Sequence, residues 1–191
     1  MENQSSQNNN IICSKENIIL IKNKENDYRI LLSSKNTKIN FRNIINFNIY
    51  KILGEVNKKN IESCEMVSSI SNNSAKFLFK FRALGLDIGI PKKYMFLETK
   101  CNQINNKEIE YISHSLDIKG TEFEKNVKGY EKITCHSSSL KIMLENSKQI
   151  HVDYNFHIDI HENLPIFATN LLGFLMKKMF LNLKLFIEKI E

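Results

Sequence analysis

The sequence predicts an α+β fold in which an antiparallel β-sheet packs against one long C-terminal α-helix. Short β-prone runs fill most of residues 17–160 and are separated by polar turn segments such as "SNNS", "NQINNK" and "ENSK". From residue 164 the pattern changes to apolar residues with helical spacing. With 191 residues, of which 42% are hydrophobic, the chain is long enough for one domain that buries roughly 70% of its unfolded surface.

Each element is predicted from its local pattern. Residues 1–16, which begin "MENQSSQNNN", contain no apolar h-region of a secretory signal, and we interpret them as a disordered Asn-rich tail before one domain at 17–191. Apolar residues near helical spacing predict a small helix within 41–59. The predicted strands are 17–23, 28–34, 64–70, 75–83, 94–101, 108–118, 130–145 and 149–160.

The last predicted element is a helix of roughly 25 residues between Leu164 and Ile190. Leu164 and Pro165 open it, because proline is well tolerated in a first helical turn, where its missing N–H would have no partner. An antiparallel sheet with one apolar face needs a cover, and this helix is the only large one available. A sheet that curves around the helix would leave a candidate pocket between them.

Composition narrows the class of protein. The formal net charge of +6 and the pI near 9.0 are compatible with nucleic acid or an acidic membrane surface. The abundance of Asn, Lys and Ile gives a second explanation for this basicity, namely A+T-rich codons. The chain has no arginine-rich stripe, RNP-like strand or zinc finger, so we expect no nucleic-acid partner.

The cysteines and the apolar runs point to a soluble intracellular protein. The 4 cysteines are widely spaced, with no C-x-x-C pair, which indicates reduced thiols rather than a zinc site or disulfides. The longest apolar run, 164–176, falls short of the about 18 to 20 residues that a membrane span requires. We expect a cytoplasmic monomer.

The segment "IHVDYNFHIDIH" at 150–161 raises the question of a metal site. Its even-numbered residues are apolar and its odd-numbered residues polar, so His157, Asp159 and His161 share one face of a strand. Residues spaced in this way hold zinc in some enzymes. The apolar face must be the buried one, however, which leaves the polar face in solvent, and we predict no metal and no cofactor. The chain also has no G-x-S-x-G elbow and no phosphate-binding loop.

Four motifs in sequence order resemble the START lipid-transfer domains. They are the strand "IPKKYMFLE" (90–98), the strand "EIEYISHSLD" (108–117), the segment "VKGYEK" (127–132) and "IDIHENLPIFATN" (158–170), which precedes the last helix. No single motif is specific, but four motifs in this order, followed by a long terminal helix, are hard to obtain by chance. Before Ile61 the resemblance is one of element order alone.

The resemblance implies a helix-grip fold, in which a curved antiparallel sheet wraps around the C-terminal helix and a tunnel between them takes one lipid. It implies an intracellular lipid-binding and lipid-transfer protein rather than an enzyme, with a lipid ligand and transient contact with membrane surfaces, anionic ones included. An apolar tunnel can compete with a bilayer for its lipid, because burial contributes about 0.8 kcal/mol per CH₂.

Two alternative functions stay open. One is a START-like interaction module with a closed cavity. The other is a helix-grip enzyme acting on a hydrophobic substrate, for which Glu98 and Tyr94 are the candidate groups.

Alternation along the strands and the helix gives the candidate ligand-binding residues. They are Phe77, Phe79, Phe81, Tyr94, Phe96, Glu98, Val152, Tyr154, Phe156, Ile158, Phe167, Asn170, Leu171, Phe174 and Leu175. The resemblance also implies a gate loop that contains Leu84, Gly85, Leu86, Ile88, Gly89 and Ile90. For each of these residues, packing in a filled core is the alternative.

The chain departs from the family where sterol-handling members carry a charge pair. Glu98 stands where the family has an arginine, and Phe79 stands where its acidic partner is expected. Glu98 is therefore expected either at a wet tunnel mouth or beside a base such as Lys80 or Arg82, because an unpaired buried carboxylate is costly. The missing pair favours a phospholipid over a sterol.

Overall fold

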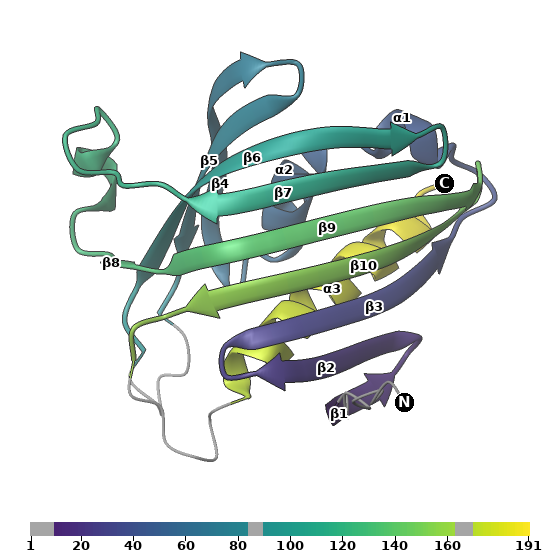
Figure 1. Ribbon diagram of the computed structural model, residues 1–191, viewed down its shortest axis with the longest axis horizontal. Coiled ribbons are helices and arrows are strands. Elements are labelled where there is room, and N and C mark those ends of the chain that lie inside the picture. Colours follow the sequence, from purple (N-terminus) through teal and green to yellow (C-terminus); the bar gives the residue numbers. More distant parts are fainter. Residues whose placement is uncertain (1–9, 84–89, 163–169) are drawn as a thin grey trace, which may run out of the picture.

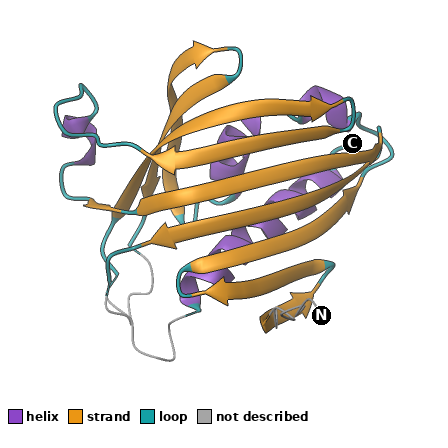
Figure 2. Cartoon of the chain, in the orientation of Figure 1, coloured by secondary structure: helices purple, strands orange, loops and turns teal. Residues whose placement is uncertain are grey.

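The computed structural model describes residues 10–83, 90–162 and 170–191. It contains a curved antiparallel sheet of 10 strands, with helices α2 and α3 on one side of it (Figures 1 and 2). The strands are β1 (Asn10–Lys15), β2 (Ile18–Lys24), β3 (Asp27–Lys35), β4 (Ile61–Ser71), β5 (Ser74–Phe81), β6 (Lys93–Asn105), β7 (Glu108–Ser115), β8 (Glu131–Lys132), β9 (Thr134–Asn146) and β10 (Gln149–Asp159). The helices are α1 (Phe41–Ile44), α2 (Asn48–Val56), the 3₁₀ turn η1 (Glu124–Val127) and α3 (Leu171–Lys189).

The strand order is β1-β2-β3-β10-β9-β7-β6-β5-β4, with β8 joined to β6 in parallel. The N-terminal strands and the last strand β10 are therefore neighbours, although Asp27 and His157 are 130 positions apart in the chain. In Figure 1 the sheet lies in front and α3 runs diagonally behind β10 and β3. The predicted antiparallel sheet with a helical cover is confirmed.

The main core fills the space between the sheet and the helices. The even-numbered residues of β10 face this core: Ile150, Val152, Phe156 and Ile158 are buried there. From the other side α3 contributes Met176, Met179, Phe180, Leu183 and Ile187. The helix approaches the sheet most closely at Gly173, where an added Cβ would lie 2.8 Å from two ring carbons of Tyr28. The absence of a side chain at Gly173 thus lets α3 rest directly on β3.

A second core lies on the outer face of the sheet. It contains Leu78 of β5, Tyr94 and Phe96 of β6, and Ile118 and Val127 from the segment between β7 and β8. This segment forms the protruding loop at the left of Figure 1. The middle of β5 and the first half of β6 are therefore buried on both faces, which explains their apolar runs at 77–79 and 94–97.

Two details differ from the sequence predictions. Residues 10–15 are not part of a disordered tail but form β1, which pairs with β2 through a turn at Glu16 and Asn17, both with positive φ. The single small helix divides into α1 and α2. The long helix is described from Leu171, and the predicted start at Leu164 and Pro165 lies outside the described residues. No helix among the described residues combines the length and the apolar character needed to cross a bilayer.

Candidate functional site

A narrow apolar cavity lies between the concave face of the sheet and α3. Its volume is about 70 Å³, and strands β3, β5, β6, β7, β9 and β10 and helices α2 and α3 all contribute to its wall. Most of the lining is aliphatic or aromatic, including Leu32, Leu53, Phe79, Leu140, Val152 and Leu183. We call this space the inner cavity.

A smaller cavity of about 40 Å³ lies beside the N-terminal end of α3. Its wall includes Ile90, Ile133, Ile158, Leu172 and Leu175. We call it the outer cavity. Phe81, Met95, Met176 and Met179 line both cavities and therefore separate one from the other. Methionine side chains are unbranched and adapt their shape easily, so this partition is built largely from the most deformable apolar residue.

Hydroxyl groups form a small polar cluster within the inner cavity. Ser113 of β7 and Ser138 of β9 are paired across the sheet, and both line the cavity with Tyr50 and Tyr154. Burial raises the pKa of Tyr50 to about 12, although the neighbouring hydroxyls of Ser113 and Thr99 lower it. Burial also raises the pKa of Tyr154 well above the usual value for a phenol. Both tyrosines are therefore neutral hydrogen-bonding groups near pH 7.

A buried lysine lies at each end of the site. Lys93 lines the outer cavity and is 1% exposed, and its ammonium contacts Glu131 at 2.7 Å and Glu162 at 2.5 Å. Lys184 lines the inner cavity, is 8% exposed, and contacts both carboxylate oxygens of Glu188 at 2.7 Å. Each cation is thus neutralised by carboxylates, as a buried charge must be.

Seven of the predicted ligand-binding residues lie at these cavities. Phe79, Phe81, Val152 and Tyr154 line the inner cavity, and Phe81, Ile158, Leu171 and Leu175 line the outer one. Ile90, from the predicted gate loop, is buried in the outer cavity wall. Phe77 and Phe156 face the same core but stack on aromatic neighbours, Phe77 on Tyr50 and Phe156 on Tyr28, and do not line either cavity.

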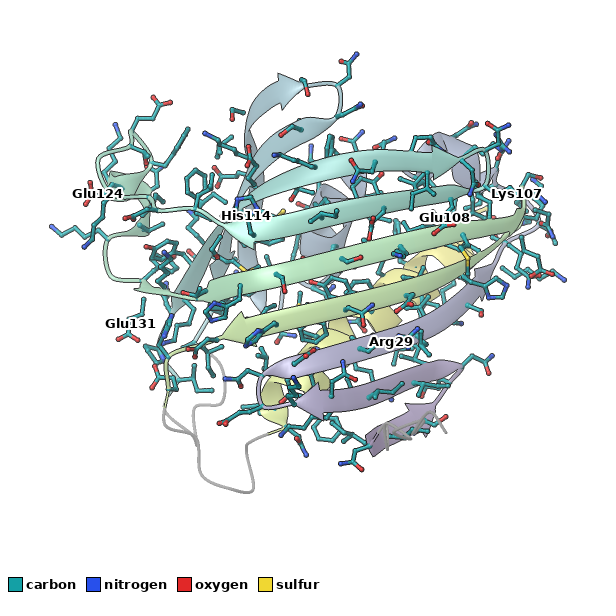
Figure 3. All side chains as sticks on the ribbon, in the orientation of Figure 1. Arg29, Lys107, Glu108, His114, Glu124 and Glu131 are labelled. Carbon is teal, nitrogen blue, oxygen red and sulfur yellow. The ribbon has the colours of Figure 1, made fainter. Side chains whose placement is uncertain are left out.

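Three predicted residues point away from the cavities. Tyr94 and Phe96 belong to the core on the outer face of the sheet, because alternation along β6 directs Met95 and Leu97 inward instead. Glu98 follows on that outer face and lies 3.6 Å from Nε2 of His114, a residue that Figure 3 labels on β7. The predicted charge partners Lys80 and Arg82 do not pair with it, since Lys80 contacts Glu65 and Arg82 donates to the carbonyl of Lys58.

The remaining predicted residues lie at the edge of the site or beyond the described residues. Phe174 is 44% exposed on the solvent side of α3. Asn170 accepts a hydrogen bond from Lys22 at 3.0 Å, which ties the start of α3 to β2. Phe167 and the predicted gate residues Leu84, Gly85, Leu86, Ile88 and Gly89 lie outside the described residues.

Sequence reasoning missed several lining residues, among them Tyr50, Met95, Leu97, Met176 and Met179. For Met95 and Leu97 the signal was present, because either parity of β6 could have faced the helix. For Met176 and Met179 the spacing of three residues on a helix was also visible. Tyr50 gave no such signal, since its role depends on how α2 packs against the sheet.

The polar face of residues 150–161 is occupied by ordinary surface contacts. Asp153 forms a two-point ion pair with Arg29 at 2.9 and 2.7 Å, and His151 contacts Ser33 and Glu145. His161 hydrogen-bonds to Thr134 and lies 3.2 Å from Asp159. Among the residues that the structure describes, no group of three or more His, Cys, Asp or Glu side chains is arranged to hold a metal ion.

Comparison with known proteins relates this architecture to one structural family. No protein-family model and no curated protein matches the sequence. Among solved structures, human StAR-related lipid transfer protein 5 is similar with a TM-score of 0.71 and 11% identity, over 95% of this chain and 86% of that chain. The lipid transfer and protein localization domain of human StarD13 is similar with a TM-score of 0.70 and 10% identity, over 93% of this chain and 88% of that chain.

A bacterial protein has the same architecture. The STAR-related lipid transfer protein of Xanthomonas axonopodis aligns with a TM-score of 0.65 and 8% identity, over 91% of this chain and 95% of that chain. These alignments cover more than nine-tenths of this chain and relate its curved sheet and terminal helix to the same overall fold. The chain has the START-like helix-grip fold.

Proposed function

We propose that this protein binds one lipid between the sheet and α3 and transfers it between membranes, acting in the cytoplasm as a monomer. The observation that carries the proposal is the alignment of the inner and outer cavities under α3. Phe81, Met95, Met176 and Met179 line both cavities and form a partition between them. The START-like fold supports the same function, because the similar solved proteins are named as lipid-transfer proteins.

The length of the apolar space suits a hydrocarbon chain. The inward-facing residues of β10 run from Ile150, beside the inner cavity, to Ile158, beside the outer one. Eight residues of strand extend about 26 Å, which exceeds the length of a common acyl chain. Each CH₂ group that enters contributes about 0.8 kcal/mol, so a chain of ordinary length has enough driving force to open the space.

The described conformation is contracted, because the cavities measure about 70 and 40 Å³. Pockets for drug-sized ligands usually have about 300 Å³ or more. We therefore propose that lipid enters by moving the α3 methionines away from the sheet. Met176 and Met179 can change shape at low cost, and the joined cavities then form one tunnel.

We propose a phospholipid rather than a sterol as the cargo. Glu98, which replaces the arginine of sterol-handling relatives, lies on the outer face of the sheet, and apolar Phe79 lies inside. No catalytic reaction is assigned to the cavity. Its tyrosines Tyr50 and Tyr154 have raised pKa values and stay protonated near neutral pH, so neither supplies a base there.

The proposed membrane contact is a groove between α2 and α3 on the side away from the sheet. Five lysines line the groove, and Leu185 and Phe186 are exposed beside them, 39% and 44% respectively. The lysines are Lys51, Lys58, Lys59, Lys178 and Lys189, of which Lys58 pairs with Glu55. Basic residues around exposed apolar side chains complement an anionic bilayer.

The double variant Lys59→Glu with Lys178→Glu should abolish sedimentation of the protein with phosphatidylserine vesicles, whereas Lys76→Glu on β5 should not.

The small cavity volume favours a second candidate function. A START-like module whose space is filled by its own aromatic and methionine side chains would act through protein partners and take up no lipid. Tyr50, Phe77 and Phe79 already stack against one another under α2. This candidate predicts that enlarging or filling the inner cavity changes stability alone.

Transfer between liposomes separates these functions. Val152→Phe adds a ring to the wall of the inner cavity, and Val127→Phe makes the same change in the outer-face core, away from either cavity. Transfer of fluorescent phosphatidylcholine between donor and acceptor liposomes should fall at least about tenfold for Val152→Phe and persist for Val127→Phe. Absence of transfer by the wild-type protein, or equal transfer by both variants, would contradict the proposal.

A further inference from the structure

The far end of the inner cavity contains a buried hydroxyl without a partner. Ser34 of β3 is 2% exposed and lines this cavity. Within the described part of the chain its Oγ has no hydrogen-bond partner. Buried polar groups are almost always paired, so this hydroxyl is available to hydrogen-bond to a ligand atom in the cavity. Ser63 and Ser74 have unpartnered hydroxyls too, but neither of them lines the cavity.

Lys184 lines the same cavity. Asn36, two residues after Ser34, donates to the backbone carbonyl of Ile187 at 2.7 Å, and the backbone N–H of Lys35 contacts Glu188 at 3.4 Å. These contacts bring the end of β3 against the end of α3. Ser34 and Lys184 therefore belong to one end of the cavity, which lies far from the outer cavity.

The partner of Lys184 can be exchanged for a ligand. Both hydrogen bonds of its ammonium go to one carboxylate, that of Glu188, whose side chain is 25% exposed. An ammonium has three donors, so at least one remains for another acceptor. Glu188 also lies in the last turn of α3, where the exposed helix carbonyls disfavour a negative charge. Rotation of Glu188 into solvent would leave Lys184 free for an anion inside the cavity.

We propose that Ser34 and Lys184 bind the oxyanion of a lipid head group, so that an anionic lipid enters with its head toward the end of α3. This inference rests on the proposed function and adds to it the chemical class and the orientation of the cargo. The shared chemistry is an oxyanion, which a phosphate or a carboxylate supplies. The hydroxyl of Ser34 donates one hydrogen bond, and Lys184 donates another and neutralises the charge.

The other buried lysine is less suited to this role. Lys93, at the outer cavity, is contacted by two carboxylates from separate parts of the chain, Glu131 and Glu162. An incoming anion would have to displace both of them or add a third negative charge. Like charges at this distance repel, so the outer end receives the hydrocarbon part of the ligand.

The test compares lipids that differ in the head group alone. Oleate, oleoyl lysophosphatidate and the neutral oleoyl alcohol are titrated into the full-length protein, and affinity is read from native mass spectra. The wild-type protein should bind at least one anionic lipid about tenfold or more tightly than the alcohol. A hydrogen bond to a charged group changes a binding affinity by about this factor. Ser34→Ala, and separately Lys184→Met combined with Glu188→Gln, should remove this preference by weakening binding of the anionic lipid far more than binding of the alcohol.

Two control variants match these changes. Ser74→Ala removes an equally unpartnered hydroxyl outside the cavities, and Lys80→Met removes a half-buried lysine that pairs with Glu65. Both should retain the wild-type preference. Ser34→Ala breaks no hydrogen bond among the described residues, so its urea midpoint should not fall even though its affinity for the anionic lipid does.

The outcomes separate the two proposals. Equal affinity for the alcohol and both anions, or an anion preference that survives both site variants, would overturn the oxyanion site while leaving lipid binding in place. Failure to bind any of the three lipids would overturn the site as well, and failure to take up lipid from mixed liposomes would then reject the proposed function itself. Preference for oleate or for lysophosphatidate identifies the oxyanion as carboxylate or phosphate.

Discussion

The ammonium of Lys93 lies 2.5 Å from a carboxylate oxygen of Glu162, and this contact joins β6 to the residues that follow β10. Glu131 of β8 completes the arrangement at 2.7 Å from the same ammonium. Burial disfavours the charged form of Lys93, but its hydrogen bonds to Glu131 and Glu162 outweigh this effect and raise its pKa. The contact therefore fastens the outer end of the cavity in a pH-dependent way.

Lys93→Met should lower the free energy of unfolding by about 1 kcal/mol at neutral pH. This loss is smaller than for a fully buried ion pair, because the carboxylates of Glu131 and Glu162 reach solvent. Lys93 lowers the pKa of Glu131 below its ordinary value of 4.5. The stability that the Glu131 carboxylate contributes is therefore lost as the pH falls through this lowered pKa. The raised pKa of Lys93 keeps its own contribution present below the ordinary lysine value of 10.5 and removes it at still higher pH. Urea unfolding of the wild-type protein and of Lys93→Met should give a difference in unfolding free energy that is constant between about pH 5 and 10 and shrinks outside this range. A difference independent of pH would contradict this explanation.

Met176→Ala should join the inner and outer cavities. Met176 is buried and lines both, so its truncation should cost about 2–4 kcal/mol of unfolding free energy and should speed lipid exchange. The matched control is Met143→Ala, because Met143 is 47% exposed on β9. Chemical denaturation and liposome exchange rates measure the two effects. Destabilisation without faster exchange would show that Met176 is not a barrier to the ligand.

Gly173→Ala tests the close contact between α3 and β3. An added Cβ would lie 2.8 Å from the ring of Tyr28 and 3.3 Å from Leu20, so the helix must move outward. Alanine gains about 1 kcal/mol in helix propensity over glycine, but overpacking should outweigh this and leave a net loss of about 1–2 kcal/mol. Thermal unfolding measures the change. A stabilised variant would mean that α3 lies farther from the sheet than described.

Asn57 joins α2 to α3. Its side chain donates to the carbonyls of Leu53 and Met179 at 2.9 and 3.2 Å and accepts from Asn182 at 2.8 Å. Asn57→Ala should cost about 2–3 kcal/mol, because it leaves buried polar groups without partners. Asn23→Ala, which removes an exposed hydrogen bond to Asp27, should cost less than about 0.5 kcal/mol in the same denaturation assay. Similar losses in both variants would deny Asn57 this role.

Alternation predicted the sheet well because most strands have one apolar face. In β10 the even-numbered residues are apolar and the odd-numbered residues polar, so Val152 and Phe156 could be assigned to the core from sequence. The terminal helix was equally clear from spacing. These elements depend on local periodicity, which the sequence contains in full.

The same rule failed on β6, where both faces are buried. Tyr94 and Phe96 share one face and Met95 and Leu97 the other, and all four are apolar or aromatic. The choice between the faces depends on the segment around Ile118 and Val127, which covers the outer side. A contact between segments so far apart in the chain leaves no periodic signal.

The polar groups of the cavity were also beyond sequence reasoning. Ser34 and Lys184 are common residue types at unremarkable positions, and they become a candidate site only because β3 and α3 end side by side. Lysine is mostly an exposed residue type, whereas Lys184 is 8% exposed. Burial of a charge on an otherwise apolar face follows from tertiary packing alone.

Lipid uptake from mixed liposomes, read by native mass spectrometry of the re-isolated protein, tests the central claim most directly. The account predicts a complex of one protein with one lipid that Val152→Phe reduces and Val127→Phe preserves. A wild-type protein that returns from the liposomes with no bound lipid would contradict the account and favour the closed interaction module.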